Sequence, residues 1–189
     1  MIARLALAFF LLATAAEAQQ PPPSVPQTVP PVVTRDAFGE EFVLPLRTVI
    51  FRKGSANWDE GWEKVREAFQ AVSAAAGRVG AKVNGHALLI YRATDDDGFE
   101  FEAALPIEAA PVPPPGGEIS VGPAPTGRAL KFVHRGAFDG METTYESIAN
   151  YIEGKGLTAE DLFIEEFVTD PLTTKQDELV INVYVPLKK

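Results

Sequence analysis

FVHRGAFDG at residues 132–140 repeats, in outline, the earlier stretch FRKGSANWDEG at 51–61. Each stretch passes from strand-like residues through a glycine to an aromatic side chain and an aspartate. A helical pattern follows in both cases and ends near Gly77 and near Gly154, because apolar side chains recur there at intervals of three and four residues. These apolar stripes are Trp62, Val65, Phe69, Val72 and Ala76 in the first stretch, and Met141, Tyr145, Ile148 and Ile152 in the second.

Two strand-like runs follow each helical stretch. The first pair covers 87–91 and 99–107, and the second covers 162–168 and 178–187. Residues 43–51 and 128–133 supply a strand before each helix. The pattern therefore predicts a strand–helix–strand–strand unit that occurs twice, at about 40–107 and about 128–189, with a Pro/Gly-rich connector at 108–127.

One such unit is too small to cover its own sheet, so we expect the two units to pack together. The predicted fold is α+β, with two pseudo-symmetric repeats that form a curved antiparallel sheet. We expect the helices to cover one face of this sheet and the other face to curve around a ligand groove.

The first 39 residues have the composition of a leader and a spacer. One early arginine, a short apolar run and the sequence Ala16-Glu17-Ala18 are typical of a secretory signal peptide at 1–18, cleaved after Ala18. As a helix, the apolar run would span about 18 Å, too short for a membrane anchor. The proline-rich segment 19–39 is interpreted as a linker. The sequence thus predicts a secreted, periplasmic protein with no stable membrane insertion after cleavage.

Charge and composition exclude several classes of function. The formal net charge is −9 and the chain contains no cysteine. A strongly acidic surface repels phosphate backbones, so no nucleic acid is expected as a partner. Without cysteine, the chain has no disulfides, thiolate metal sites or cysteine nucleophiles. The two histidines, His86 and His134, lie far apart in the sequence, and we expect neither a metal nor a cofactor.

The second unit resembles the GyrI-like effector-binding domain, the ligand-binding module of many AraC- and MerR-type regulators. The likeness is carried by PTGRA at 125–129, HRGAF at 134–138, FIEEFVTDP at 163–171 and VINVYVPL at 180–187. It extends over about 40–189, although the first unit matches only in outline. The resemblance implies a groove that binds small, often lipophilic or cationic molecules. The sequence departs from the regulators in having a predicted signal peptide where they have a DNA-binding headpiece, so a role in transcription is not expected.

Glu165 is the main candidate for a ligand-binding residue, and the resemblance implies that it faces the ligand. In a strand, Phe163, Glu165 and Phe167 point to one face, which would leave a carboxylate poorly solvated between two rings. A cationic ligand would compensate for this burial. The alternative is a rim glutamate in water. Phe167 stands where the family commonly has tyrosine, and Glu166 is expected to be exposed on the opposite face.

Three further aromatic residues are candidates for the groove. Tyr145 lies on the core stripe of the second helix, where a purely structural role is the alternative. Tyr91 lies on the equivalent hairpin of the first unit, and Trp58 lies at the start of the first helix. The first-unit counterpart of Glu165 is Leu89 or Ile90, so the site is expected to be one-sided.

The sequence favours an exported protein that binds a small hydrophobic or cationic molecule. One alternative is a hydrolase in which Glu165 acts as general base, with Tyr145 or Tyr91 as proton donor. Another is a binder of haem or another tetrapyrrole, since proteins of the SOUL type resemble this fold. A third is an interaction module that uses the proline-rich arm.

Overall fold

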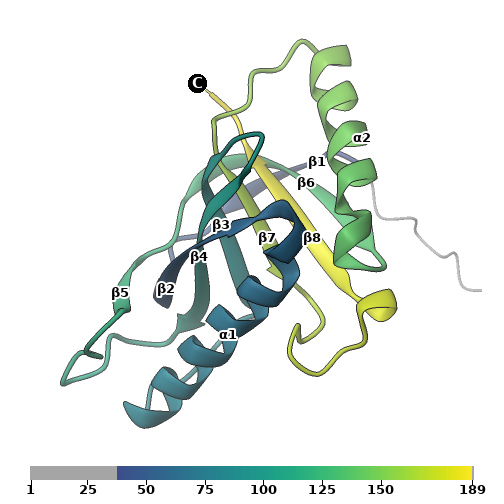
Figure 1. Cartoon of the computed structure of the whole chain (residues 1–189). Helices are drawn as coiled ribbons and strands as arrows, with labels where there is room; N and C mark the ends of the chain where they lie inside the picture. Colours follow the sequence, from purple (N-terminus) through teal and green to yellow (C-terminus); the bar gives the residue numbers. More distant parts are fainter. Residues whose placement is uncertain (1–37, 189) are drawn as a thin grey trace, which may run out of the picture. The chain divides into compact units, whose positions relative to one another are not determined.

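The computed structural model describes residues 38–188, and these form one antiparallel eight-stranded sheet and two long helices (Figure 1). The α+β prediction is confirmed. The predicted signal peptide and most of the predicted linker lie outside the described residues. The elements are β1 (Glu40–Leu44), β2 (Thr48–Asn57), α1 (Gly61–Arg78), β3 (Ala87–Thr94), β4 (Gly98–Ile107), β5 (Ile119–Pro123), β6 (Gly127–Arg135), α2 (Met141–Gly154), β7 (Phe163–Phe167) and β8 (Val180–Pro186).

The order of the strands shows the duplication directly. The sheet runs β1-β6-β8-β7-β3-β4-β2-β5. If every strand is replaced by its counterpart in the other repeat (β1 by β5, β2 by β6, β3 by β7 and β4 by β8, and the reverse), the same order is obtained when it is read from the other edge. β3 and β7 are the central pair, and Leu89 lies opposite Glu165 in their register. The pseudo-twofold axis therefore passes through the middle of this pair.

Each repeat contains one more strand than the sequence pattern predicted. Residues 43–51 do not form one strand, because the chain leaves β1 before Pro45 and resumes in β2 at Thr48. The predicted connector 108–127 contains β5, which is the counterpart of β1. β1 pairs with β6 of the second repeat, and β5 pairs with β2 of the first. Each repeat thus contributes its first strand to the other half of the sheet.

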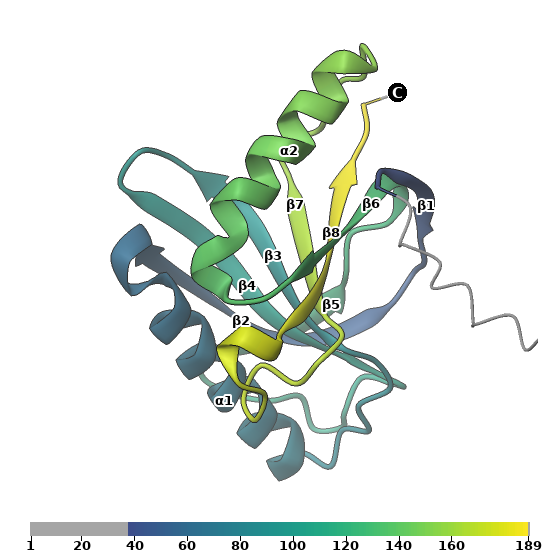
Figure 2. The ribbon, with the colours of Figure 1, turned by 90° about the vertical axis from the view of Figure 1, so that its right-hand side faces the viewer.

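Both helices lie on one side of the sheet (Figures 1 and 2). α1 packs on it through a stripe that includes Val65, Phe69 and Val72, and α2 packs through Met141 and Ile148. The predicted helical stripes therefore face the core. None of the helices formed by residues 38–188 is long and apolar enough to cross a membrane.

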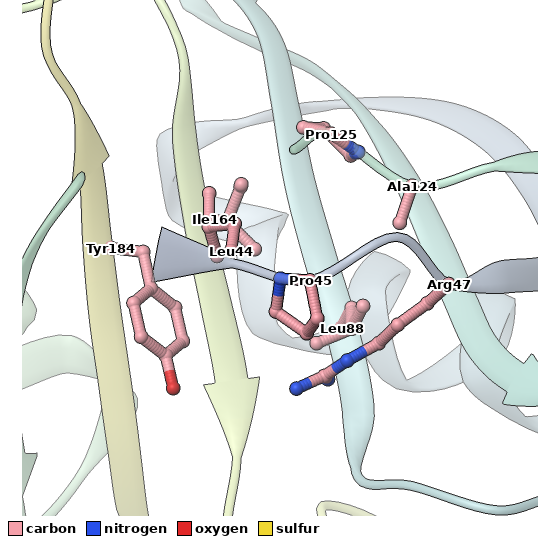
Figure 3. A pocket seen from close by; sticks show the side chains of 8 residues that line it. All are labelled: Leu44, Pro45, Arg47, Leu88, Ala124, Pro125, Ile164 and Tyr184. Atoms are coloured by element: carbon pink, nitrogen blue, oxygen red, sulfur yellow. The ribbon is translucent and has the colours of Figure 1, made fainter. Parts of the chain in front are cut away.

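The opposite face of the sheet is covered by two short straps. Residues 45–47 join β1 to β2, and residues 124–126 join β5 to β6. Figure 3 shows Pro45 lying across the strands that carry Leu88 and Ile164, with Pro125 on the second strap. The amide of Ala124 donates a hydrogen bond to the carbonyl of Arg47 (2.9 Å), which joins the straps. The straps therefore fill the middle of this face. Glu165 points to the opposite face, towards the helices, so the expectation that it lies in a groove on the face away from the helices is wrong.

Glu166 lies on this strap-covered face and is buried, with only 6% of its surface exposed. The expectation of an exposed, solvated glutamate is wrong. Arg47 reaches it from the strap at 2.9 Å, and Tyr184 and Asn182 donate hydrogen bonds to its other oxygen. Burial alone would raise the pKa of Glu166, but the hydrogen bonds from Tyr184, Arg47 and Asn182 outweigh it and hold the pKa below its usual value.

Replacing Arg47 by Met is expected to lower the free energy of unfolding by about 2 kcal/mol at pH 7, because it leaves the Glu166 carboxylate buried without its cation. The deficit should shrink towards pH 4, where Glu166 becomes protonated in the variant. Urea unfolding measures both effects. Arg128→Met is the control, since Arg128 and Glu41 form an exposed 3.9 Å pair that contributes little. Equal losses in the two variants would contradict this account.

Candidate functional site

Glu165 occupies the centre of the sheet on its helix-covered face. Its side chain is 0% exposed. In the pairing register it lies between Leu89 of β3 and Val183 of β8, and both are buried apolar residues. Strand alternation explains the placement, because Phe163 and Phe167 point the same way while Ile164 and Glu166 point to the straps. The predicted alternation along this strand is confirmed.

The two carboxylate oxygens of Glu165 have different surroundings. The hydroxyl of Tyr145, on α2, donates a hydrogen bond of 2.7 Å to Oε1. Oε2 is fully buried and has no hydrogen-bond partner among the described residues. The hydroxyl of Tyr91, on β3, lies close enough to favour the charged form of the carboxylate, but it does not complete a hydrogen bond to Oε2.

These surroundings shift the pKa values of all three groups. Burial raises the pKa of Glu165 to about 7, although the hydroxyls of Tyr145 and Tyr91 act in the opposite direction. Burial also raises the pKa values of Tyr91 and Tyr145 well above 10, and the neighbouring Glu165 adds to this. The groups that lower the pKa of Glu165 are therefore neutral hydroxyls and not a cation. At neutral pH the carboxylate is poised between its two protonation states.

Aromatic rings close the space around this carboxylate. Phe163 packs edge-to-face on Tyr145, with ring centroids 5.4 Å apart. At the other end of β7, Phe167 contacts Trp62 of α1 at 6.1 Å. Trp62 in turn stacks on Phe138, which precedes α2, at 5.1 Å. Since Trp62 and Phe138 belong to different repeats, their stack bridges the two helix starts above the sheet.

Glu165 is fully buried, whereas four of the aromatic residues just described are only partly buried. These partly buried residues are Trp62, Phe138, Tyr145 and Phe163. Phe167 is fully buried and also packs against Phe69. The carboxylate thus lies beneath packed side chains and not at the floor of an open groove.

Each polar side chain of the site corresponds to an apolar side chain in the other repeat. By the register of the strands, Leu89 occupies in the first repeat the position of Glu165 in the second. Val65 and Tyr145 are both the fifth residue of their helices. Tyr91 lies two residues after Leu89, and its counterpart is Phe167, which lies two residues after Glu165. Each of the three polar side chains therefore has an apolar counterpart, and the expected one-sidedness is found, with Leu89 as the counterpart of Glu165.

The structure brings together most of the residues proposed from the sequence. Glu165, Tyr145 and Tyr91 form one cluster, and Phe163 and Phe167 flank it. Trp58 lies apart from the carboxylate: it is 51% exposed, contacts Phe99 at 5.0 Å, and donates a hydrogen bond from Nε1 to the carbonyl of Asp95. It approaches the cluster only through Phe99, whose ring is 5.2 Å from that of Tyr91.

Two residues of the ring cluster were not among the proposed site residues. Trp62 belongs to the predicted apolar stripe of α1, and Phe138 belongs to the repeated motif that precedes α2. Their contact joins residues 76 positions apart in the sequence, and neither helical periodicity nor strand alternation can indicate such a contact. The aromatic identity of both residues beside the two helix starts was the available signal.

The remaining candidate groups have structural roles. The ring of His134 is buried and bonded to the carbonyl of Ala137 (3.0 Å) and the hydroxyl of Thr144 (2.8 Å), which fixes the turn before α2. Asp95 accepts hydrogen bonds from the amides of Asp97 and Gly98 and so closes the β3–β4 turn. Within residues 38–188, no group of three or more histidine or acidic side chains is arranged to hold a metal ion.

Several solved structures share this fold. EcmrR in a DNA complex superimposes with a TM-score of 0.68 and 12% identity over 80% of this chain, which spans 57% of the EcmrR chain. A hydrolase from Listeria innocua gives 0.61 and 13%, covering 80% of this chain and 92% of the other. SAV2435 bound to tetraphenylphosphonium gives 0.54 and 13%, covering 80% and 94%. At these identities the likeness shows the fold alone.

Sequence comparison gives a more specific result. No curated protein matches the chain significantly. The family model of the GyrI-like small molecule binding domain matches residues 43–188, which include every strand of the two repeats except the first residues of β1. The chain therefore belongs to the GyrI-like family of small-molecule-binding domains.

Proposed function

We propose that this protein binds a small hydrophobic cation, with Glu165 as the counter-charge and the surrounding rings as the walls of the site. The observation that carries the proposal is the burial of Glu165, a 0% exposed carboxylate without a cation beside it. Buried charges in proteins are normally paired, because an isolated one is strongly disfavoured. A cationic ligand would supply the missing partner.

The expected interaction energies favour this assignment. A unit charge about 4 Å from the carboxylate gains about 4 kcal/mol at an intermediate effective dielectric constant. A cation placed over an aromatic face gains about 0.5–2 kcal/mol more. The carboxylate would therefore select for positive charge, while the rings would select for apolar shape. The structure of SAV2435 with tetraphenylphosphonium supports this class of ligand for the fold.

Ligand entry requires movement of side chains, because Glu165 is closed off in the described structure. The aromatic residues of the helix-covered face that are only partly buried are Trp62, Phe138, Tyr145 and Phe163, so these are the rings whose movement would open a path. Aromatic rings turn about two side-chain torsions, so they can part without unfolding either helix. We place the ligand between Tyr145 and the Trp62–Phe138 stack, in contact with Glu165.

The N-terminal sequence supports the further proposal that the protein acts outside the cytoplasm. This proposal rests on the signal-peptide pattern alone, and that pattern lies outside the described residues. A cation-binding protein in this location would sequester or sense its ligand before the ligand enters the cell.

Tetraphenylphosphonium is expected to bind about tenfold more tightly at pH 8 than at pH 6. Its charge does not depend on pH, whereas Glu165, with a pKa of about 7, is mostly protonated at pH 6. Isothermal titration calorimetry measures the two affinities. Glu165→Gln should weaken binding at pH 8 at least tenfold and remove the dependence on pH. Glu146→Gln is the matched control, because Glu146 is exposed on the same helix as Tyr145. Undiminished binding by Glu165→Gln would contradict the assigned role.

The unliganded protein should be more stable as Glu165→Gln than as wild type at pH 8, by about 3 kcal/mol. The raised pKa means that the folded state holds a proton that the unfolded chain releases near pH 4.5. Wild-type stability is therefore lost as the pH rises from about 4.5 to about 7, and the glutamine variant avoids this loss. Urea unfolding at pH 5 and pH 8 gives the difference. A constant difference between the two pH values would count against it.

Hydrolysis is the second candidate function, favoured by a pKa near 7 on a carboxylate that is hydrogen-bonded to a tyrosine. A general base works best with a pKa near the working pH. Glu165 would take a proton from water as the water oxygen bonds to an electrophilic substrate atom. Tyr145 would give its proton to the leaving group and recover one from Glu165. A protein of this fold from Listeria innocua is described as a hydrolase, which supports a hydrolytic function for the fold.

Binding and turnover are separated by following bound compounds over time by mass spectrometry. If the protein is a hydrolase, a compound that binds should gain the mass of water, and Glu165→Gln should abolish this change. Tyr145→Phe should slow turnover more than it weakens binding, since the ring and its packing remain, although loss of the hydroxyl also raises the pKa of Glu165. Recovery of every bound compound unchanged after long incubation would leave ligand binding as the function.

A further inference from the structure

The second oxygen of Glu165 lacks a hydrogen-bond donor. Oε1 accepts the hydroxyl of Tyr145, but Oε2 is one of two buried side-chain polar atoms without a partner among residues 38–188, the other being Nε of Arg66. The residues directly beside Glu165 in the sheet, Leu89 and Val183, have no donor to offer. Nearly all buried polar atoms in folded proteins have a partner, so this exception requires a reason.

A ligand meets this requirement only if it carries a hydrogen-bond donor as well as a charge. A quaternary ammonium or phosphonium ion brings charge to the carboxylate but has no N–H group. A protonated secondary or tertiary amine brings the same charge and can also donate an N–H to Oε2. Because Coulomb attraction is nearly the same for both, the hydrogen bond distinguishes them, and charge-assisted hydrogen bonds are the stronger kind.

We propose that the preferred ligand is a protonated amine whose N–H donates to Oε2 of Glu165, and not a permanently charged onium ion. This inference rests on the proposed cation-binding function and specifies the ligand class. Tyr145 would keep its hydrogen bond to Oε1, so the bound carboxylate would have a donor on each oxygen. The apolar substituents of the amine would pack among the rings.

Tyr91 is the competing donor. Its hydroxyl lies close to the same carboxylate without completing a bond to Oε2. If this hydroxyl turned to Oε2 in solution, it would compete with the ligand N–H for that oxygen. Tyr91→Phe removes this competitor while keeping the ring, so the variant separates the two possible donors.

The test compares two probes that differ by one methyl group: N,N-dimethyl-2-naphthylmethylamine and its N-methyl quaternary salt. At pH 8, calorimetry on the wild-type protein should show about tenfold tighter binding of the protonated amine. Glu165→Gln should weaken the binding of both cations, because the amide carries no charge, and should lower their ratio, because the hydrogen bond is no longer charge-assisted. Tyr91→Phe should keep or increase the ratio. Exposed Glu146→Gln should behave as wild type.

Each alternative outcome has a distinct meaning. Equal binding of the two probes to both the wild type and Tyr91→Phe would overturn the amine preference and leave the cation site intact. A preference that appears only in Tyr91→Phe would assign Oε2 to the tyrosine in the natural protein and would also overturn the inference. Failure of both probes and of tetraphenylphosphonium to bind would remove the proposed function itself.

Discussion

The cost of burying one carboxylate at the centre of the sheet constrains the rest of this structure. Glu165 lies where the two repeats meet, with Leu89 opposite it in the register, and it has no contact with water. Such a group is tolerated only if it stays protonated, finds donors, or meets a cation. Tyr145 and Tyr91 supply partial compensation, and burial still holds the pKa near 7. The fold therefore holds a buried carboxyl group that has hydroxyl neighbours but no cation beside it.

The adjacent glutamate shows that the protein can compensate a buried carboxylate fully. Glu166 points to the opposite face and has a cation from Arg47, a hydroxyl from Tyr184 and an amide from Asn182. Its pKa is lowered, whereas that of Glu165 is raised. Two consecutive residues of the same type thus have opposite electrostatic surroundings. The Glu166 network ties the first strap to the sheet, so the carboxylate without a cation is the one on the helix-covered face.

The sequence predicted what depends on local periodicity. Alternation along β7 placed Phe163, Glu165 and Phe167 on one face, and helical spacing identified the buried stripes of α1 and α2. Contacts between distant residues were not predictable in this way. Arg47 and Glu166 are 119 residues apart, so the burial of Glu166 had no local signal. For the same reason alternation could not say which face of the sheet meets the helices. The exchange of β1 and β5 between the repeats also depends on long-range pairing.

Duplication explains how the site is accommodated. In the first repeat, Leu89 and Val65 fill the positions that Glu165 and Tyr145 occupy in the second. These positions therefore accept buried apolar side chains. Tyr91, whose counterpart in the second repeat is Phe167, comes from the first repeat. Three polar side chains therefore lie together near the pseudo-twofold axis: Tyr91 from the first repeat, and Tyr145 and Glu165 from the second. The apolar counterparts around them keep the sheet folded, and the destabilisation is confined to the few side chains that a ligand would contact.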